Sequence, residues 1–288
     1  AVVGGMHSSV ILEELAEIHR LQVPYLIPWA AIPSLTQHQY DPSYTFRVSI
    51  PDNQVAPFLL EQALKLDKRV AILLERSAWG RSNEAALASL MTRLPRGHAE
   101  ISWIDAGDTA IFERIGTLVR AGFGSVLMVA NAPEARAIVK AMAAEEKSIP
   151  IFAHWGLTGG DFFAPLQTAL QKVDLRFVQS VLAEEVRTHR KLGSFLQHYR
   201  QHYGLGAETP VPSLIGSVHA YELTQLLARA VTQARSSDRP AIRKALESLP
   251  RHSGVLQDYA PPFTRERHDA IDQKLLHLAR FDRAGHIV

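Results

Sequence analysis

The regular alternation of apolar strands and helical segments, from about Lys68 to Val181, is the feature that most constrains the fold. Its first strand, Arg69–Glu75, is a continuous apolar run, as expected for a strand that is covered on both faces. Alternation of this kind predicts a parallel sheet with helices on both faces, an α/β fold. Strands are predicted at residues 69–75, 101–105, 125–130, 150–154 and 175–181, and helices at 82–94, 109–120, 133–146 and 165–172.

The chain of 288 residues is long enough to form two lobes. After Val181 the pattern changes to helices, which are predicted at 184–203, 215–234 and 240–249, and residues 254–288 read as loop and hairpin. We predict that lobe 1 comprises residues 1–66 and 213–272, and lobe 2 residues 67–212 and 273–288. Three passages of the chain between the lobes would form a hinge.

The composition excludes several classes of function. The 31 basic and 29 acidic residues give a net charge of +2, which provides no basis for a nucleic-acid-binding surface. No apolar run approaches the roughly 20 residues that cross a bilayer, so the sequence predicts a protein that is not embedded in the membrane. Cysteine is absent, which excludes disulfides, thiolate nucleophiles and zinc–thiolate sites and suits an oxidising compartment.

Residues 1–36 contain the best candidate for a binding site. Two predicted strands each end in a turn of small residues that opens a helix: the first leads into Gly4-Gly5 and Ser8-Ser9, the second (Val23–Pro28) into Ala30–Thr36. Such turns leave backbone N–H groups unpaired at the start of a helix. Those N–H groups form a favourable seat for a carboxylate.

The segment resembles the first lobe of the periplasmic solute-binding proteins of branched-chain amino acid transporters, the Leu/Ile/Val-binding family. The same resemblance continues through nearly the whole chain. It is carried by the Gly-Gly turn, the serine pair, the Val-Pro-Tyr-Leu-Ile-Pro strand, the Ala-Ala-x-Pro-x-Leu-Thr turn, Phe46–Val48, Asp52-x-Gln54 and the strand 276–281. Proteins of that family begin with a further strand–helix–strand–helix unit, which this sequence is expected to lack.

The resemblance implies the type I periplasmic binding fold, with two Rossmann-like lobes of parallel sheet joined by a three-segment hinge. It also implies an extracytoplasmic receptor in the periplasm that binds a small carboxylate in the cleft between its lobes and delivers it to an inner-membrane ABC permease. A ligand-sensing regulatory or receptor domain with the same fold is the alternative, although no helix-turn-helix or membrane segment is visible.

Four residues of the first lobe are candidate ligand contacts. Ser8 and Ser9 would cap the predicted helix 10–21, bind a carboxylate, or do both; Ser8 matches the family's ligand-contacting serine. Ala30 and Ala31 stand where the family has a small residue followed by a threonine. Ala31 keeps the backbone N–H but lacks the hydroxyl, which removes a hydrogen bond worth about 0.5–1.5 kcal/mol.

Three residues of the second lobe, Trp79, Asn131 and Trp155, follow the carboxyl ends of predicted strands, where α/β sheets bind ligands. Trp155 replaces the acidic residue with which amino acid binders of the family hold the ligand's ammonium group. A buried cation without a counter-charge is costly. The two tryptophans therefore indicate an aromatic or largely apolar carboxylate, unless one or both rings belong to the core.

No enzyme or cofactor motif is present: the sequence contains no Gly-x-Ser-x-Gly elbow, phosphate loop or Gly-x-Gly-x-x-Gly turn after a strand. His198 and His202 have the i, i+4 spacing of a zinc site but no third ligand nearby, so a solvated helix face is the favoured interpretation. We expect a binding protein without catalytic residues, cofactor or metal.

Overall fold

The computed structural model describes residues 1–66, 69–182, 185 and 189–288, and the chain divides into two compact units. Unit 1 comprises Ala1–Pro51 and Glu184–Leu275, and unit 2 comprises Asp52–Ala183 and Leu276–Val288. These boundaries differ from those predicted from the sequence, 66/67, 212/213 and 272/273. Helix α2 (Asp52–Leu64) belongs to unit 2 because it contacts β4, β6, β7 and α3, and helix α7 (Arg190–His202) belongs to unit 1.

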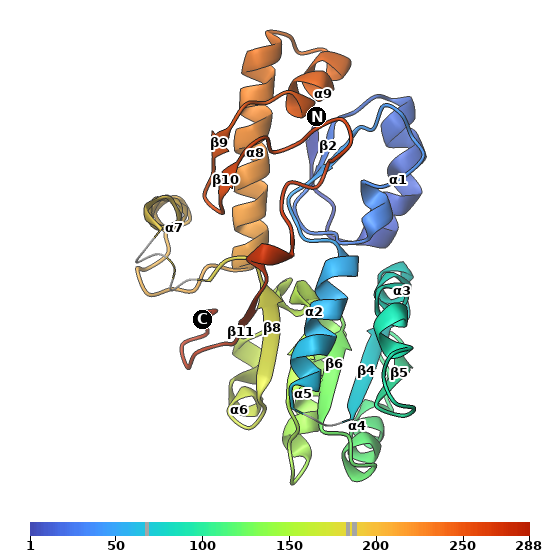
Figure 1. Ribbon diagram of the computed structural model, residues 1–288. Helices are drawn as coiled ribbons and strands as arrows, with labels where there is room; N and C mark the ends of the chain where they lie inside the picture. Colours follow the sequence, from blue (N-terminus) through green and yellow to red (C-terminus); the bar gives the residue numbers. More distant parts are fainter. Residues whose placement is uncertain (67–68, 183–184, 186–188) are drawn as a thin grey trace. The chain divides into compact units, whose positions relative to one another are not determined.

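In the described part of unit 2, six strands form one sheet in the order β11-β8-β7-β6-β4-β5 (Figure 1). All neighbours are parallel except β11, which runs antiparallel to β8. The predicted α/β architecture with parallel sheets is confirmed. The strands are β4 (Val70–Glu75), β5 (Ala99–Ile104), β6 (Ser125–Val129), β7 (Ile151–Ala153), β8 (Leu175–Gln179) and β11 (His277–Ala279).

The direction of the strand order explains how the helices of unit 2 are placed. The chain passes from β4 outward to β5, then crosses back over β4 to β6 and continues to β7 and β8. Because parallel crossovers are right-handed, this reversal places the helices before and after it on opposite faces. Accordingly, α2 packs beside α3 (Ala78–Met91), while α4 (Ile111–Arg120), α5 (Ala132–Ala144) and α6 (Gln167–Leu170) pack in succession.

Unit 1 contains a short parallel sheet in the order β1-β2-β3, formed by Val2–Val3, Tyr25–Ile27 and Thr45–Arg47. Residues 268–270 extend this sheet, because the Arg47 N–H donates to the His268 carbonyl and the Ala270 N–H donates to the Arg47 carbonyl. The other elements described in unit 1 are α1 (Ser8–Arg20), η1 (Pro33–Leu35), α7, α8 (Leu214–Ala234), α9 (Arg239–Glu247), the hairpin of β9 (His252–Ser253) and β10 (Asp258–Tyr259), and η5 (Gln273–Leu275).

Several helix ends lie within two residues of their predicted positions, as for α5 and α9. Pro133 and Pro240 stand in the first turns of α5 and α9, and Asp238 caps α9 by accepting from the Ala241 N–H at 3.2 Å. Gly204, with φ of +64°, follows α7. The predicted helix 184–203 is observed from Arg190; residues 184 and 186–188 lie outside the described residues.

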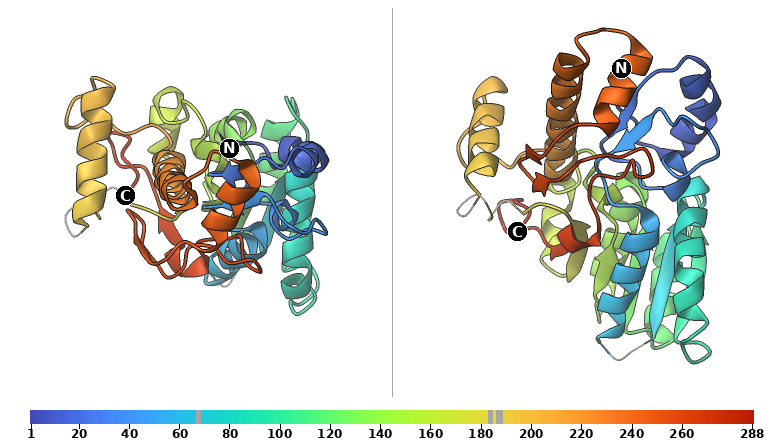
Figure 2. Two further views of the ribbon diagram at one scale, coloured as in Figure 1. Left: turned by 90° about the horizontal axis from the view of Figure 1, so that it is seen from above. Right: turned by 45° about the horizontal axis from the view of Figure 1, so that its top comes forward.

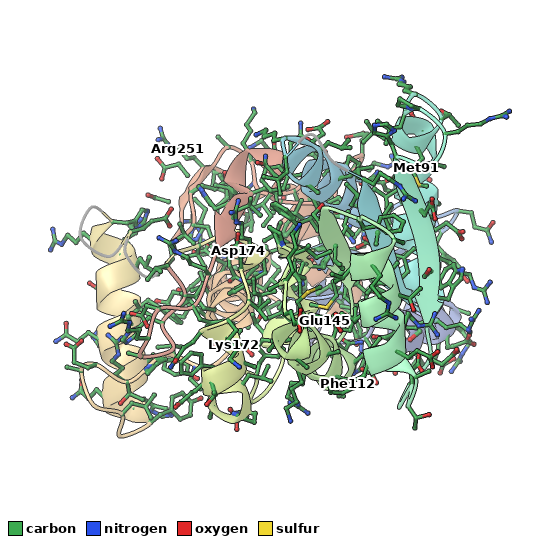
Figure 3. All side chains as sticks on the ribbon, turned by 90° about the horizontal axis from the view of Figure 1, so that it is seen from below. Met91, Phe112, Glu145, Lys172, Asp174 and Arg251 are labelled. Carbon is green, nitrogen blue, oxygen red and sulfur yellow. The ribbon has the colours of Figure 1, made fainter. Side chains whose placement is uncertain are left out.

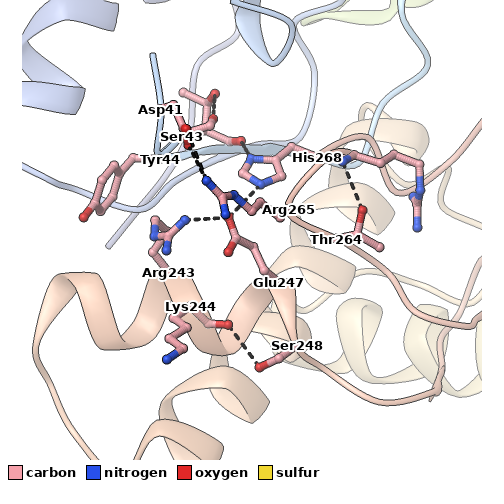
Figure 4. A network of polar contacts seen from close by, with 12 residues as sticks. Asp41, Ser43, Tyr44, Arg243, Lys244, Glu247, Ser248, Thr264, Arg265 and His268 are labelled. Carbon is pink, nitrogen blue, oxygen red and sulfur yellow. Dashed lines mark hydrogen bonds and ion pairs between the residues drawn. The ribbon is translucent and has the colours of Figure 1, made fainter. Parts of the chain in front are cut away.

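Helices α8 and α9 pack against each other (Figure 2), and a polar network ties α9 to the sheet of unit 1 (Figure 4). The Glu247 carboxylate lies 2.6 Å from Arg243 Nη1 and 3.2 Å from His268 Nε2. The other ring nitrogen of His268, Nδ1, lies 2.7 Å from the Thr45 carbonyl oxygen, and burial lowers the pKa of this histidine. The network therefore fixes β3 to α9 through the mainly buried imidazole of His268.

Among the described helices, none combines the length and apolar character needed to span a membrane.

Candidate functional site

Ser8 is the first residue of α1 and is buried, and its hydroxyl oxygen accepts a hydrogen bond from the Ala31 N–H at 3.2 Å. The helix therefore starts two residues earlier than predicted. The predicted capping role is wrong, because His7 occupies the N-cap position and no side chain caps the helix. Ser9, the other predicted serine, is exposed. The hydroxyl proton of Ser8 has no acceptor among the described residues, so it is available for a bound anion.

The turn that contains Ala30 and Ala31 is held from two directions. Both alanines are buried, and the Ala30 carbonyl accepts from the Ser49 hydroxyl at 2.9 Å. On one side, the Pro28 carbonyl oxygen lies 2.8 Å from Nδ1 of the buried His219 in α8. The Trp29 ring packs on the same helix at Gly216, where a Cβ atom would come within 2.7 Å of the ring. The turn is thus a rigid part of unit 1.

In unit 2, Trp79 and Asn131 stand where the strand order reverses, at the carboxyl ends of β4 and β6. Such topological switch points are the usual ligand-binding positions of open α/β sheets. Glu75, at the end of β4, joins the two sides: its Oε2 accepts from the Asn131 backbone N–H at 3.0 Å and from its side-chain Nδ2 at 2.8 Å. The predicted contact residue Asn131 is therefore held by a carboxylate that sequence reasoning missed.

Trp79 and Trp155 flank one imidazole. The His154 ring centroid lies 4.8 Å from that of Trp79 and 4.1 Å from that of Trp155. His154 and Trp155 are buried, Trp79 partly so. Asp52, the first residue of α2, completes the cluster, since its Oδ1 accepts from Trp79 Nε1 at 3.0 Å and lies 3.3 Å from His154 Nε2.

The position of Trp79 depends on a close approach of α3 to the end of β4. A Cβ atom on Gly80 would lie 1.9 Å from the Glu75 carbonyl oxygen, which is backbone and cannot move aside cheaply. We expect Gly80→Ala to destabilise the protein by about 1–3 kcal/mol, the usual effect of overpacking. Urea denaturation would measure this loss, with Gly4→Ala as control because nothing lies within 4 Å of that Cβ position. Equal stability of the two variants would contradict the close approach.

Two surface pockets of unit 2 lie apart from these residues. One, of about 370 Å³, is lined by residues that include the exposed Phe112, and the other, of about 450 Å³, by residues that include Lys172 (Figure 3). Neither lining includes a residue predicted from the sequence to contact a ligand.

Among the described residues, no group of three or more His, Cys, Asp or Glu side chains is arranged to hold a metal ion, and His198 and His202 are exposed.

The structure thus places the predicted residues in two sets, Ser8, Ser9, Ala30 and Ala31 in unit 1 and Trp79, Asn131 and Trp155 in unit 2. Sequence reasoning missed the contacts of Asp52 and Glu75. The available signals were their positions, since Glu75 ends an otherwise apolar strand and Asp52 opens a helix just after Pro51, and the Asp52-x-Gln54 motif of the family resemblance.

The sequence profile of the family described as "Periplasmic binding protein" matches residues 1–285. Among curated proteins, none is detectably similar in sequence to the chain.

Solved structures share the fold at low sequence identity. A periplasmic binding protein type 1 from Bordetella pertussis Tohama I has a TM-score of 0.82 and 18% identity, over 99% of this chain and 79% of that one. The substrate-binding protein LivJ from Streptococcus pneumoniae, in complex with isoleucine, has a TM-score of 0.78 and 19% sequence identity, over 100% of this chain and 78% of that one. A solute-binding protein from R. palustris, in complex with benzoate, has a TM-score of 0.76 and 17% sequence identity, over 99% of this chain and 75% of that one.

Proposed function

Because this chain belongs to the periplasmic binding protein family, we propose that it is the solute-binding receptor of an ABC transporter and that it binds a small carboxylate. Residues of both units would contact the ligand: Ser8, Ser9, Ala30 and Ala31 from unit 1, and Trp79, Asn131 and Trp155 from unit 2. The permease of the inner membrane would be its protein partner and the periplasm its location. The function requires binding and release without chemical change of the ligand, so no residue is assigned a catalytic role.

The buried Ser8 hydroxyl is the observation that carries this proposal. Its oxygen accepts the Ala31 N–H, and its own proton is still free to be donated to a further partner. A carboxylate oxygen is a suitable acceptor, and the positive end of the α1 dipole beside Ser8 favours an anion. A neutral acceptor could use the Ser8 proton but would gain less from the helix dipole, and a cationic group would be disfavoured by that dipole.

The aromatic cluster of unit 2 supports an organic acid with an apolar or aromatic body. Two indole rings and an imidazole offer flat apolar surface, and aromatic pairs contribute about 0.5–1.5 kcal/mol beyond the burial of area. The structural neighbours named above were solved with isoleucine and with benzoate, two carboxylates with apolar bodies. An amino-acid-like or an aromatic acid therefore fits the proposal.

A thermal-shift screen of aliphatic amino acids and aromatic acids tests the proposed function. A ligand at one hundred times its Kd stabilises the folded protein by about 2.7 kcal/mol, which raises the melting temperature measurably. Carboxylates that stabilise the protein, while the corresponding amides do not, would support it. Failure of all carboxylates would contradict it, and chemical conversion of a hit, detected by mass spectrometry, would show an enzyme instead.

Ser8→Ala is expected to weaken the binding of every carboxylate hit by about tenfold, the effect of one hydrogen bond to a charged group. Isothermal titration calorimetry would measure the change. Ser194→Ala is the matched control, since Ser194 is exposed on α7 of the same unit. Equal affinities of the Ser8 variant and the control would remove Ser8 from the site.

A further inference from the structure

Asp52 is buried and only half satisfied. Its Oδ1 accepts from Trp79 Nε1 at 3.0 Å and lies 3.3 Å from His154 Nε2, but Oδ2 has no hydrogen-bond partner among the described residues. Buried polar atoms in native proteins nearly always have a partner. An orphaned carboxylate oxygen in the folded protein therefore indicates that a donor from outside the described protein groups completes the site.

Neither contact of Asp52 supplies a positive charge at neutral pH. The indole N–H of Trp79 is neutral, and burial lowers the pKa of His154 although the Asp52 carboxylate opposes that shift. The carboxylate is thus supported by one neutral donor, the Trp79 indole, and by the positive end of α2, of which it is the first residue. Such a group is a strong acceptor for one further hydrogen bond.

The surroundings of Asp52 identify the chemical class of that donor. The Trp79 and His154 rings lie beside it, and the Trp155 ring packs on that of His154, so a group that reaches Asp52 has aromatic surface next to it. A ring hydroxyl has one proton and needs one acceptor, which Oδ2 supplies. An ammonium group has three protons, whereas Asp52 offers a single unused oxygen.

We propose that Asp52 determines specificity by accepting a hydrogen bond from a hydroxyl group of the ligand, so that the preferred ligands are hydroxylated aromatic acids. This inference rests on the proposed function, because it assumes that a carboxylate is bound. It adds Asp52 as a specificity-determining residue and Trp79 as the residue that positions its Oδ1.

The test compares ligands that differ only in the donor. Isothermal titration calorimetry would measure the affinity of the protein for benzoate, for the three monohydroxybenzoates and for their methoxy counterparts, which keep the oxygen but lack the proton. We expect at least one hydroxybenzoate to bind about tenfold more tightly than benzoate, the effect of a hydrogen bond to a charged acceptor. Its methoxy counterpart should lose that advantage. Benzoate that binds as tightly as every hydroxybenzoate would overturn the inference.

Asp52→Asn is the protein variant for this comparison. Asparagine can keep the acceptor that faces Trp79 and His154 while it replaces Oδ2 by an NH₂ donor. The ratio of hydroxybenzoate to benzoate affinity should fall to within about twofold, and an unchanged ratio would overturn the inference. Asp108→Asn is the matched control, because Asp108 lies just before α4 in the same unit and its hydrogen-bond partners are the Ala110 N–H and Arg114 instead of the cluster around His154. In the control the ratio should be that of the unaltered protein.

The remaining outcomes separate the two proposals. If phenylalanine or leucine binds more tightly than all hydroxybenzoates, the donor is an ammonium group; the choice of a hydroxyl is then wrong, while the proposed carboxylate receptor stands. If no carboxylate binds, the proposed function itself fails. The ligand comparison uses only the unaltered protein, so it decides the inference even if Asp52→Asn does not fold.

Discussion

Arg47→Met is expected to lower the free energy of unfolding by about 3–5 kcal/mol, the usual cost of removing one partner of a buried ion pair. Arg47 is fully buried and its guanidinium donates to Asp269 Oδ1 at 2.8 Å, to the Ile32 carbonyl at 2.8 Å and to the Thr36 hydroxyl at 3.1 Å. Methionine fills a similar volume but donates nothing, so Asp269 loses its cationic partner and keeps only Thr36 and Gln37 as side-chain donors among the described residues. Urea denaturation would measure the loss.

The matched control is Arg265→Met, which breaks the ion pair of Arg265 with Asp41 in the same unit. Both of those side chains are 70% exposed, so the melting temperature should not change measurably. Adding Asp269→Asn to the Arg47 variant should recover part of the loss, because it removes a mostly buried carboxylate charge that has lost its cationic partner. A loss for Arg47→Met no larger than that for the control would show that the buried pair contributes little.

The second large effect is acid destabilisation through His219. Burial lowers the pKa of this histidine in α8 to about 4, while the unfolded chain keeps the ordinary value of 6.5. Between these values the unfolded state binds a proton that the folded state does not, so stability is complete above pH 6.5 and falls as the pH falls towards 4. A difference of this size corresponds to about 3 kcal/mol.

Denaturation curves at several pH values between 7 and 4 would measure this dependence. His219→Gln removes the titrating group and should reduce the change in stability across the range, whereas His198→Gln, at an exposed position of α7, should leave it unaltered. His38, whose pKa burial also lowers to about 4, adds a smaller share because it is only partly buried. Identical pH dependence of the His219 variant and the unaltered protein would contradict the argument.

The sequence predicted the parallel sheet of unit 2 because each strand can be recognised from its own consecutive residues, as in the apolar run of β4. It did not predict the strand order. The sequence of a crossover helix has the same pattern whether the next strand is added further from β4 or on its other side. The reversal of strand order at β4 therefore leaves no local signal in the sequence. The placement of α2 failed for a similar reason: a helix is assigned to a lobe by what it packs against, which only the tertiary structure contains.

The candidate site was predictable in outline and not in its contacts. Ser8 was identified from its position after a small-residue turn, yet its partner is the Ala31 N–H, 23 residues away. Likewise, the unit 2 set follows from residues at strand ends, while the pairing of Asp52 with Trp79 joins positions 27 apart. Side chains that meet through tertiary packing have no spacing rule, so the sequence could indicate the edge of the sheet but not its hydrogen bonds.

The antiparallel edge strand β11 has a consequence for biosynthesis. It pairs with β8, from which it is separated by the second segment of unit 1, Glu184–Leu275. As the ribosome releases the chain from its N-terminal end, β8 emerges long before the residues that cover its free side. During that interval the nascent protein displays an unpaired edge of the kind that chaperones protect from aggregation.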